Sequence, residues 1–139
     1  MKLLPALFLS ALVAFSMQAK AQDARAVDDA KEAARAWLAQ VDQGKYAESW
    51  DSAAAASREK VSRSAWAQSI GSVRGAQGAV KARASDTAIF TKSLPGAPAG
   101  EYVVLQYRTE FANAPAAIET VIPMREKDGT WKVSGYFIK

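Results

Sequence analysis

The spacing of the apolar residues changes once along this chain, from a period of about 3.6 residues before Ala79 to a period of two after it. Between Ala24 and Val41, apolar side chains recur every three or four residues and charged side chains fill the other positions, which predicts an amphipathic helix. After Ala79, apolar and polar residues alternate, which predicts strands. Helices followed by antiparallel strands indicate an α+β domain, with about three N-terminal helices packed on a bent four-stranded sheet in a cone-like arrangement.

Capping residues predict where these helices begin and end. Asp23 is expected to cap the first helix, and Gly44 is expected to end it in a left-handed conformation. A second helix is predicted over residues 45–56, and a third begins at Ser62 or Ser64 and weakens through the glycines of "GSVRGAQG". The third helix is expected to present one apolar side, formed by Trp66, Ile70 and Val73.

Four strands follow from the two-residue alternation. The first runs from Ala79 through Ile89, with Val80, Ala82 and Ala84 alternating against polar residues. The loop of residues 91–100 is rich in proline and glycine. The second strand, "EYVVLQYRTEF", is expected to turn four apolar residues to one side: Val103, Leu105, Tyr107 and Phe111.

The last two strands form a hairpin around Asp128-Gly129, because both residues accept positive φ. This turn predicts that Met124 faces Val133, Ile122 faces Gly135 and Thr120 faces Phe137. Together with Trp131, these residues are expected to form one apolar face in the core. In that register Pro123, which has no N–H, would leave a carbonyl unpaired, so we predict a β-bulge or strand end there, with Gly135 helping the sheet bend.

The N-terminal segment has the features of a cleaved signal peptide. A basic start is followed by the apolar run "LLPALFLSALVAF" and by Ala19-Lys20-Ala21, the small-x-small pattern of a cleavage site between Ala21 and Gln22. The run is too short to span a bilayer, and the chain has no cysteine that could carry a lipid. We therefore expect a signal peptide over 1–21 and a single periplasmic or secreted domain over 22–139, rather than a buried N-terminal helix.

Composition excludes several chemistries. The chain has neither histidine nor cysteine, which rules out Ser-His-Asp triads, Cys-His dyads and zinc sites built on those ligands. No metal or cofactor is expected. The net charge of +4 falls to +2 without Lys2 and Lys20, and the charges of both signs are interspersed, so neither nucleic acid nor anionic lipid is expected as a partner.

An aromatic corner, "WLAQVDQGKYAESWD", is the first candidate site. Trp37, Tyr46 and Trp50 could stack on a ligand ring, with Asp42 or Asp51 as a polar partner. The same residues could instead be core, because Trp37 lies in the apolar stripe of the first helix and the other two can fold back onto it. We favour the core interpretation.

Charged residues supply the other candidates. Arg74 could point beneath the sheet and pair with Glu119 or Glu110, or bind a ligand carboxylate, although a solvated arginine is favoured. Glu119 is expected on the polar face of the sheet, among solvated charges of both signs. The "SREK" segment at 57–60 matches the S-x-x-K motif of serine β-lactamases, but the K-T-G strand and the domain size of those enzymes are absent.

The chain resembles domain-of-unknown-function family 4019, a group of bacterial proteins that often carry a signal peptide. The matching residues are "WLAQVDQGKYAESWD", Trp66, Arg74 before Gly78, "LPGAPAGEY", Phe111, Glu119 and "WKVSGYFI". In "AAAASREK" the chain has alanine and polar residues where the family pattern has bulky apolar ones. More loosely, the order of elements is similar to nuclear-transport-factor-2-like and cystatin-like cones, and this implies a pocket between the first helix and the sheet.

Three functions are compatible with these features. The favoured hypothesis is a non-catalytic domain that binds a small molecule or an envelope partner, with Trp37, Arg74, Tyr107 and Glu119 as candidate ligand contacts. An alternative is a cone-fold enzyme in which Glu119 is the general base and Arg74 or Tyr107 stabilises developing negative charge. The third is a structural or assembly protein of the envelope.

Overall fold

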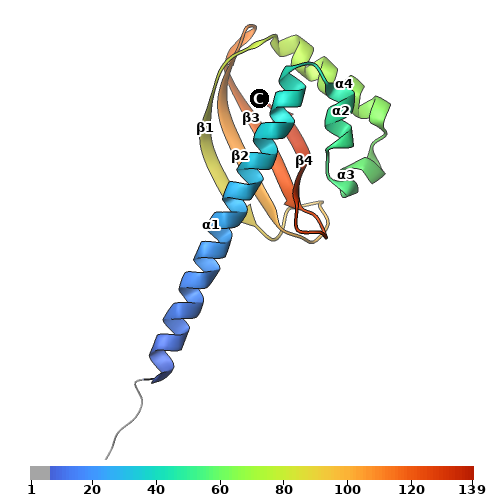
Figure 1. Ribbon diagram of the computed structural model, residues 1–139. Coiled ribbons are helices and arrows are strands. Elements are labelled where there is room, and N and C mark those ends of the chain that lie inside the picture. The colour runs from blue at the N-terminus through green and yellow to red at the C-terminus, as the bar shows by residue number, and fades with distance from the viewer. Residues whose placement is uncertain (1–6) are drawn as a thin grey trace, which may run out of the picture.

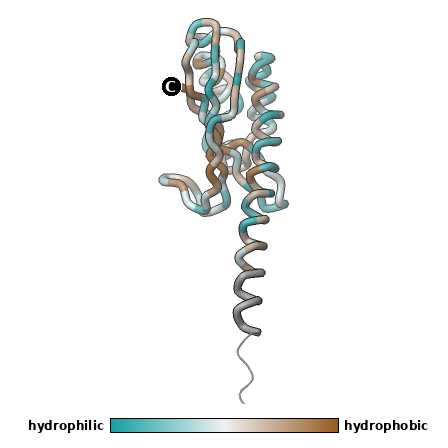
Figure 2. Tube along the Cα trace, turned by 90° about the vertical axis from the view of Figure 1, so that its left-hand side faces the viewer, coloured by the Kyte–Doolittle hydropathy of each residue, from teal (hydrophilic) through white to brown (hydrophobic). Residues whose placement is uncertain are grey.

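Helices cover one face of a four-stranded antiparallel sheet in the computed structural model, which describes residues 7–139 and the side chains from Phe15 onward (Figure 1). The strand order is β1-β2-β3-β4. A view turned by 90° shows the sheet and α1 as two layers (Figure 2). The predicted α+β class is confirmed. The elements are α1 (Leu7–Asp42), α2 (Tyr46–Asp51), α3 (Ala55–Lys60), α4 (Arg63–Gln77), β1 (Val80–Thr91), β2 (Tyr102–Phe111), β3 (Ala114–Arg125) and β4 (Trp131–Ile138).

The long helix α1 packs its C-terminal half on the sheet and extends beyond the domain at its other end (Figure 1). Its buried residues are Ala30, Ala34, Trp37, Leu38 and Val41. The helix begins at Leu7, so Asp23 lies inside it and the predicted N-cap is wrong: the residues around Asp23 include no helix breaker. Residues 15–25 are all exposed, Ala21 and Gln22 among them, while the basic start at Met1-Lys2 lies outside the described residues.

The corner after α1 is closed by Gly44, as predicted. Gly44 has φ 75°, and the backbone N–H of Lys45 donates to the carbonyl of Gln40 at 2.9 Å, the pattern of a Schellman cap. The predicted helix over 45–56 is wrong, since it is broken after Asp51. There the N–H of Ala54 donates to the carbonyl of Val133 at 2.8 Å, so a tertiary hydrogen bond overrides alanine's helix propensity.

Helix α4 begins at a Ser62 cap, whose hydroxyl accepts the N–H of Ala65 at 3.2 Å. It continues through its internal glycines and ends at Gly78, where φ is 79°. Its buried side is Trp66, Ile70 and Arg74, spaced four residues apart. Val73 was expected on this side but is 39% exposed, because the four-residue spacing puts Arg74 in that stripe, where it pairs with Asp42 and lies over the ring of Phe111.

Strand β2 presents its predicted apolar residues to the helices, whereas β1 presents polar residues to them. Val103, Leu105, Tyr107 and Phe111 are buried, as is Thr109. On β1, Arg83 faces inward opposite Thr109, while Ala82 and Ala84 are exposed. The alternation predicted for this strand is present, but its polar residues rather than its alanines face the helices. Two register shifts in β1, between Val80 and Ala82 and between Ser85 and Thr87, interrupt the simple alternation.

The bulge predicted at Pro123 is confirmed. Ile122 pairs with Gly135 and Thr120 with Phe137, but Pro123 pairs with Val133 and Met124 with Lys132, so Ser134 is the extra residue of a bulge. The expected pair of Met124 with Val133 is wrong for this reason. The carbonyl that proline cannot pair, on Ser134, instead accepts the hydroxyl of Ser57 at 2.8 Å.

The extra residue also reverses which side of β4 faces the helices. Trp131 and Val133 belong to the core together with Tyr136, three residues beyond Val133. Ile122 is half-buried in a second, small cluster with Ala54, Tyr102 and Met124, and Phe137 is 59% exposed on the face away from the helices. The prediction of one apolar face that joins all these residues is therefore wrong beyond Ser134. The side of β3 that faces the core carries Ala117, Glu119 and Val121.

Candidate functional site

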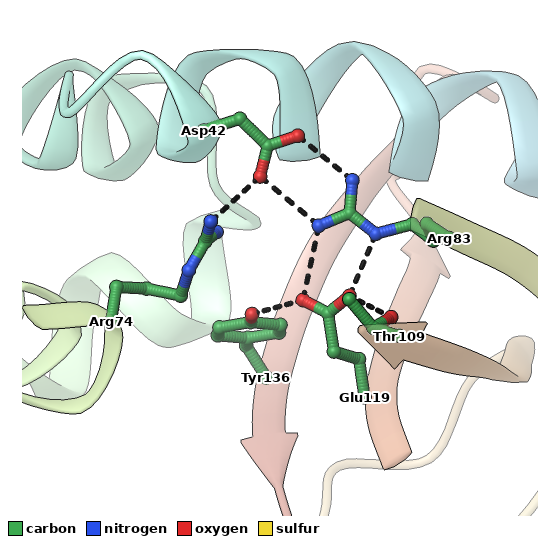
Figure 3. A network of polar contacts seen from close by, with 6 residues as sticks. All are labelled: Asp42, Arg74, Arg83, Thr109, Glu119 and Tyr136. Atoms are coloured by element: carbon green, nitrogen blue, oxygen red, sulfur yellow. Dashed lines mark hydrogen bonds and ion pairs between the residues drawn. The ribbon is translucent and has the colours of Figure 1, made fainter. Parts of the chain in front are cut away.

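A cluster of charged side chains connects four elements beneath the C-terminal end of α1 (Figure 3). Arg83 of β1 is at its centre. Its Nε donates to Glu119 of β3 at 2.7 Å, and its Nη1 donates to Asp42, the last residue of α1, at 2.8 Å. Nη2 reaches both carboxylates, at 3.0 Å and 3.2 Å. One guanidinium thus ties α1 to two strands of the sheet.

Glu119 is fully buried, with 0% of its surface exposed, and both of its oxygens are occupied. Oε1 accepts hydrogen bonds from Arg83 and from the hydroxyl of Thr109 at 2.5 Å. Oε2 accepts from Arg83 and from the hydroxyl of Tyr136. The prediction that Glu119 lies on the solvated polar face is wrong, because β3 turns it toward the helices. No oxygen of this carboxylate is free to accept a proton from a substrate.

Arg74 of α4 completes the cluster, and its interpretation as a solvated arginine is wrong. Only 5% of its side chain is exposed, and Nη2 lies 2.9 Å from Oδ1 of Asp42 rather than pairing with Glu119 or Glu110. Its guanidinium lies over the ring of Phe111, 5.1 Å from the centroid. Its Nε and Nη1 are buried without a hydrogen-bond partner, so the aromatic face supplies part of their electrostatic compensation.

The ion pairs set the protonation of the cluster. Burial alone would raise the pKa of Asp42, but the hydrogen bonds and charges of Arg83 and Arg74 outweigh it and hold that pKa below its usual value. Burial alone would lower the pKa of Arg83, but its bonds to Asp42 and Glu119 raise it. Burial and the charge of Glu119 raise the pKa of Tyr136. Asp42 and Arg83 therefore stay ionised and Tyr136 stays neutral across the physiological range.

A groove of about 460 Å³ lies between α1 and strands β1 and β2, beside this cluster. Asp42 and Arg83 belong to both the cluster and the groove wall. Tyr107 lines the groove with 8% of its surface exposed, and burial raises its pKa. A smaller hollow of about 80 Å³ adjoins the groove and shares three of its residues. The groove is lined by Asp28, Lys31, Glu32, Arg35, Leu38, Ala39, Asp42, Arg83, Ser85 and Tyr107.

The structure separates the four candidate contacts. Tyr107 lines the groove, Arg74 and Glu119 belong to the charged cluster, and Trp37 lies in the core. The indole N–H of Trp37 donates to the carbonyl of Ser49 at 3.0 Å, and its ring meets Trp66 edge-on, with centroids 6.3 Å apart. The aromatic corner is thus built into the core, as favoured from the sequence.

Other motifs offer less chemistry. The hydroxyl proton of Ser57, in the S-x-x-K match, is donated to the carbonyl of Ser134. Among the described residues, no group of three or more acidic side chains is placed to hold a metal ion. None of the described helices combines the length and apolar character that a membrane crossing requires.

The fold and the groove define a small α+β domain with a ligand-sized depression between its first helix and its sheet. A family of proteins described as "Protein of unknown function (DUF4019)" matches residues 33–136, and the chain belongs to this family, as the resemblance predicted. No curated protein and no solved structure matches the chain. The likeness to cone folds therefore stays a prediction.

Proposed function

We propose that this chain is an exported, periplasmic or secreted domain that binds a small molecule without transforming it. The main support is the groove between α1 and the sheet. Its volume of about 460 Å³ falls within the roughly 300–1,000 Å³ typical of ligand sites. Its wall is held by the ion pairs of Asp42 and Arg83, so the groove is largely formed before a ligand arrives.

The geometry favours binding over catalysis. A cone-fold enzyme needs a carboxylate within reach of the substrate proton, about 2.6–3.2 Å or one water away. Glu119 was the candidate for that role, and its oxygens already accept four hydrogen bonds in a fully buried position. Arg74, the candidate for stabilising negative charge, is likewise engaged with Asp42. Both residues are thus better explained as supports of the groove wall.

Export is compatible with the way α1 packs. Residues 15–25 are exposed, and Val27 is the first described residue that packs against the core. Cleavage between Ala21 and Gln22 would therefore remove no core side chain of the described part of the chain. Mass spectrometry of the protein from the periplasm of a Gram-negative host tests this proposal. A mature chain that begins at Gln22 supports export, and an unprocessed cytoplasmic chain contradicts it.

Binding is tested by a thermal-shift screen of periplasmic metabolites, muropeptides, fatty acids and metal ions. A ligand at 100 times its dissociation constant adds about 2.7 kcal/mol, roughly a 10 °C shift for a domain of this size. Ala39→Trp places an indole in the groove and should abolish the shift. Ala36→Trp, on the same helix but outside the groove lining, should preserve it. A shift unchanged by Ala39→Trp contradicts the groove as the binding site.

One observation favours the assembly alternative, in which the chain binds an envelope protein. The face of the sheet opposite the helices is uncovered, and Ile89 and Phe137 are each 59% exposed on it. Exposed apolar surface of this kind is a feature of protein interfaces. A screen with no thermal shift, combined with specific capture of one envelope protein that Phe137→Ser abolishes, would favour this second function.

A further inference from the structure

Three polar side chains from different elements line the place where the groove adjoins the smaller hollow. Lys31 comes from α1, Ser85 from β1 and Tyr107 from β2, and all three line both the groove and the adjoining hollow of about 80 Å³. Ser85 and Tyr107 are direct partners in the β1–β2 ladder, so their side chains share the inner face of the sheet. Among the described residues, these three are the ones that line both hollows, and we call them the shared wall.

The hydrogen-bonding groups of the shared wall are unused. Tyr107 is more than nine-tenths buried, and its hydroxyl has no partner among the described residues, although it is not closed off from solvent. The side chains of Ser85 and Lys31 likewise make no hydrogen bond or ion pair within that part of the chain. A buried tyrosine hydroxyl normally finds a partner, and here the open position faces the groove.

The charges around the shared wall leave one cation uncompensated. In the groove lining, Arg35 pairs with Glu32 at 2.6 Å, and Asp42 is neutralised by Arg74 and Arg83. Asp28 lines the larger hollow and forms no ion pair with Lys31. Asp86, which lines the smaller hollow, pairs with Arg108 at 3.3 Å. The shared wall therefore presents the ammonium of Lys31 beside two hydroxyl groups.

We infer that Lys31, Ser85 and Tyr107 form a subsite for the carboxylate of a small organic acid. The inference rests on the proposed binding function and names the ligand class. A single carboxylate matches one unpaired cation and two neutral donors. A doubly charged phosphate fits less well, because one lysine would face two charges and Asp28 would repel the excess. The raised pKa of Tyr107 keeps its phenol protonated, so that it donates to the anion at neutral pH.

Matched acid and amide pairs test the subsite on the purified protein. Benzoate and benzamide, and hexanoate and hexanamide, are titrated at pH 7 while protein NMR follows the backbone amides. We expect the acids to bind at least about tenfold more tightly than the amides, and to shift the signals of Lys31, Ser85 and Tyr107. Lys31→Gln and Tyr107→Phe should each weaken acid binding about tenfold. Lys81→Gln, an exposed position of β1 outside both hollows, should leave it unchanged.

The outcomes distinguish a failure of the carboxylate subsite from a failure of the binding function proposed for the groove. If the amides bind in the groove as tightly as the acids, or if Lys31→Gln leaves the dissociation constant for the acids unchanged, the carboxylate subsite is wrong and the binding groove stands. If neither acids nor amides shift any groove signal, the carboxylate subsite is wrong, and a thermal-shift screen without any hit then removes the binding function as well.

Discussion

Replacement of Glu119 by glutamine should strongly destabilise the fold. The carboxylate accepts two hydrogen bonds from Arg83, at 2.7 Å and 3.2 Å, one from Thr109 at 2.5 Å and one from Tyr136. An amide keeps the shape but turns one acceptor into a donor and removes the charge that compensates Arg83. Breaking a buried ion pair by removing one partner costs about 3–5 kcal/mol. The melting temperature should therefore fall by roughly 10–20 °C.

Urea unfolding at pH 7, followed by tryptophan fluorescence, measures this loss. Trp37 and Trp66 lie in the core, so their emission reports the global transition. Glu110→Gln is the matched control, since Glu110 lies exposed on the other face of the neighbouring strand and should change the unfolding free energy by less than about 0.5 kcal/mol. A loss below about 1 kcal/mol for Glu119→Gln would refute the assignment of Glu119 as a structural anchor.

Three further predictions concern stability. The unfolding free energy should fall below about pH 4, because the pKa of Asp42 is lower in the folded protein than its unfolded value of about 3.9, and it should fall above about pH 10, because folding raises the pKa of Tyr136. Urea midpoints from pH 2 to 11 measure both changes, and Asp42→Asn should make the acid one shallower, leaving the contributions of Asp51 and Asp128. Gly44→Ala should lower the free energy of unfolding by about 1–2 kcal/mol, because Gly44 has φ 75°. Gly75→Ala, inside α4 with open space around the added methyl group, should raise it by up to about 1 kcal/mol. Differential scanning calorimetry compares the two variants, and equal effects would contradict the capping role of Gly44. A chain of residues 22–139 should unfold at the same urea concentration as the full chain, and a lower midpoint would show that the exposed end of α1 contributes to stability.

Features set by local rules could be predicted from the sequence. The Gly44 cap needs positive φ, and the bulge at Pro123 follows from a missing N–H, so one residue determines each. The apolar face of β2 followed from the two-residue spacing of Val103, Leu105 and Tyr107 and from Phe111 in the same alternation. The break after Asp51 could not be predicted locally, because the carbonyl that attracts Ala54 belongs to Val133 on β4.

The charged cluster could not be predicted because its members are far apart in the chain. Arg83 and Glu119 look like solvated strand residues. Arg83 can be buried because Glu119 and Asp42 compensate its charge, and Glu119 can be buried because Arg83 compensates its charge. Arg74 was recognised as a residue that could point inward, but its partner was missed. The groove residues Lys31 and Ser85 carry no motif, and only the packing of α1 across β1 brings them beside Tyr107.

A crystal structure of the protein with the ligand that gives the largest thermal shift tests the central claim most directly. The account predicts electron density for that ligand in the groove between α1 and strands β1 and β2, in contact with Tyr107, and an unchanged Glu119 still bonded to Arg83. Density at the uncovered face of the sheet, or a Glu119 released from Arg83 and in contact with the ligand, would contradict it.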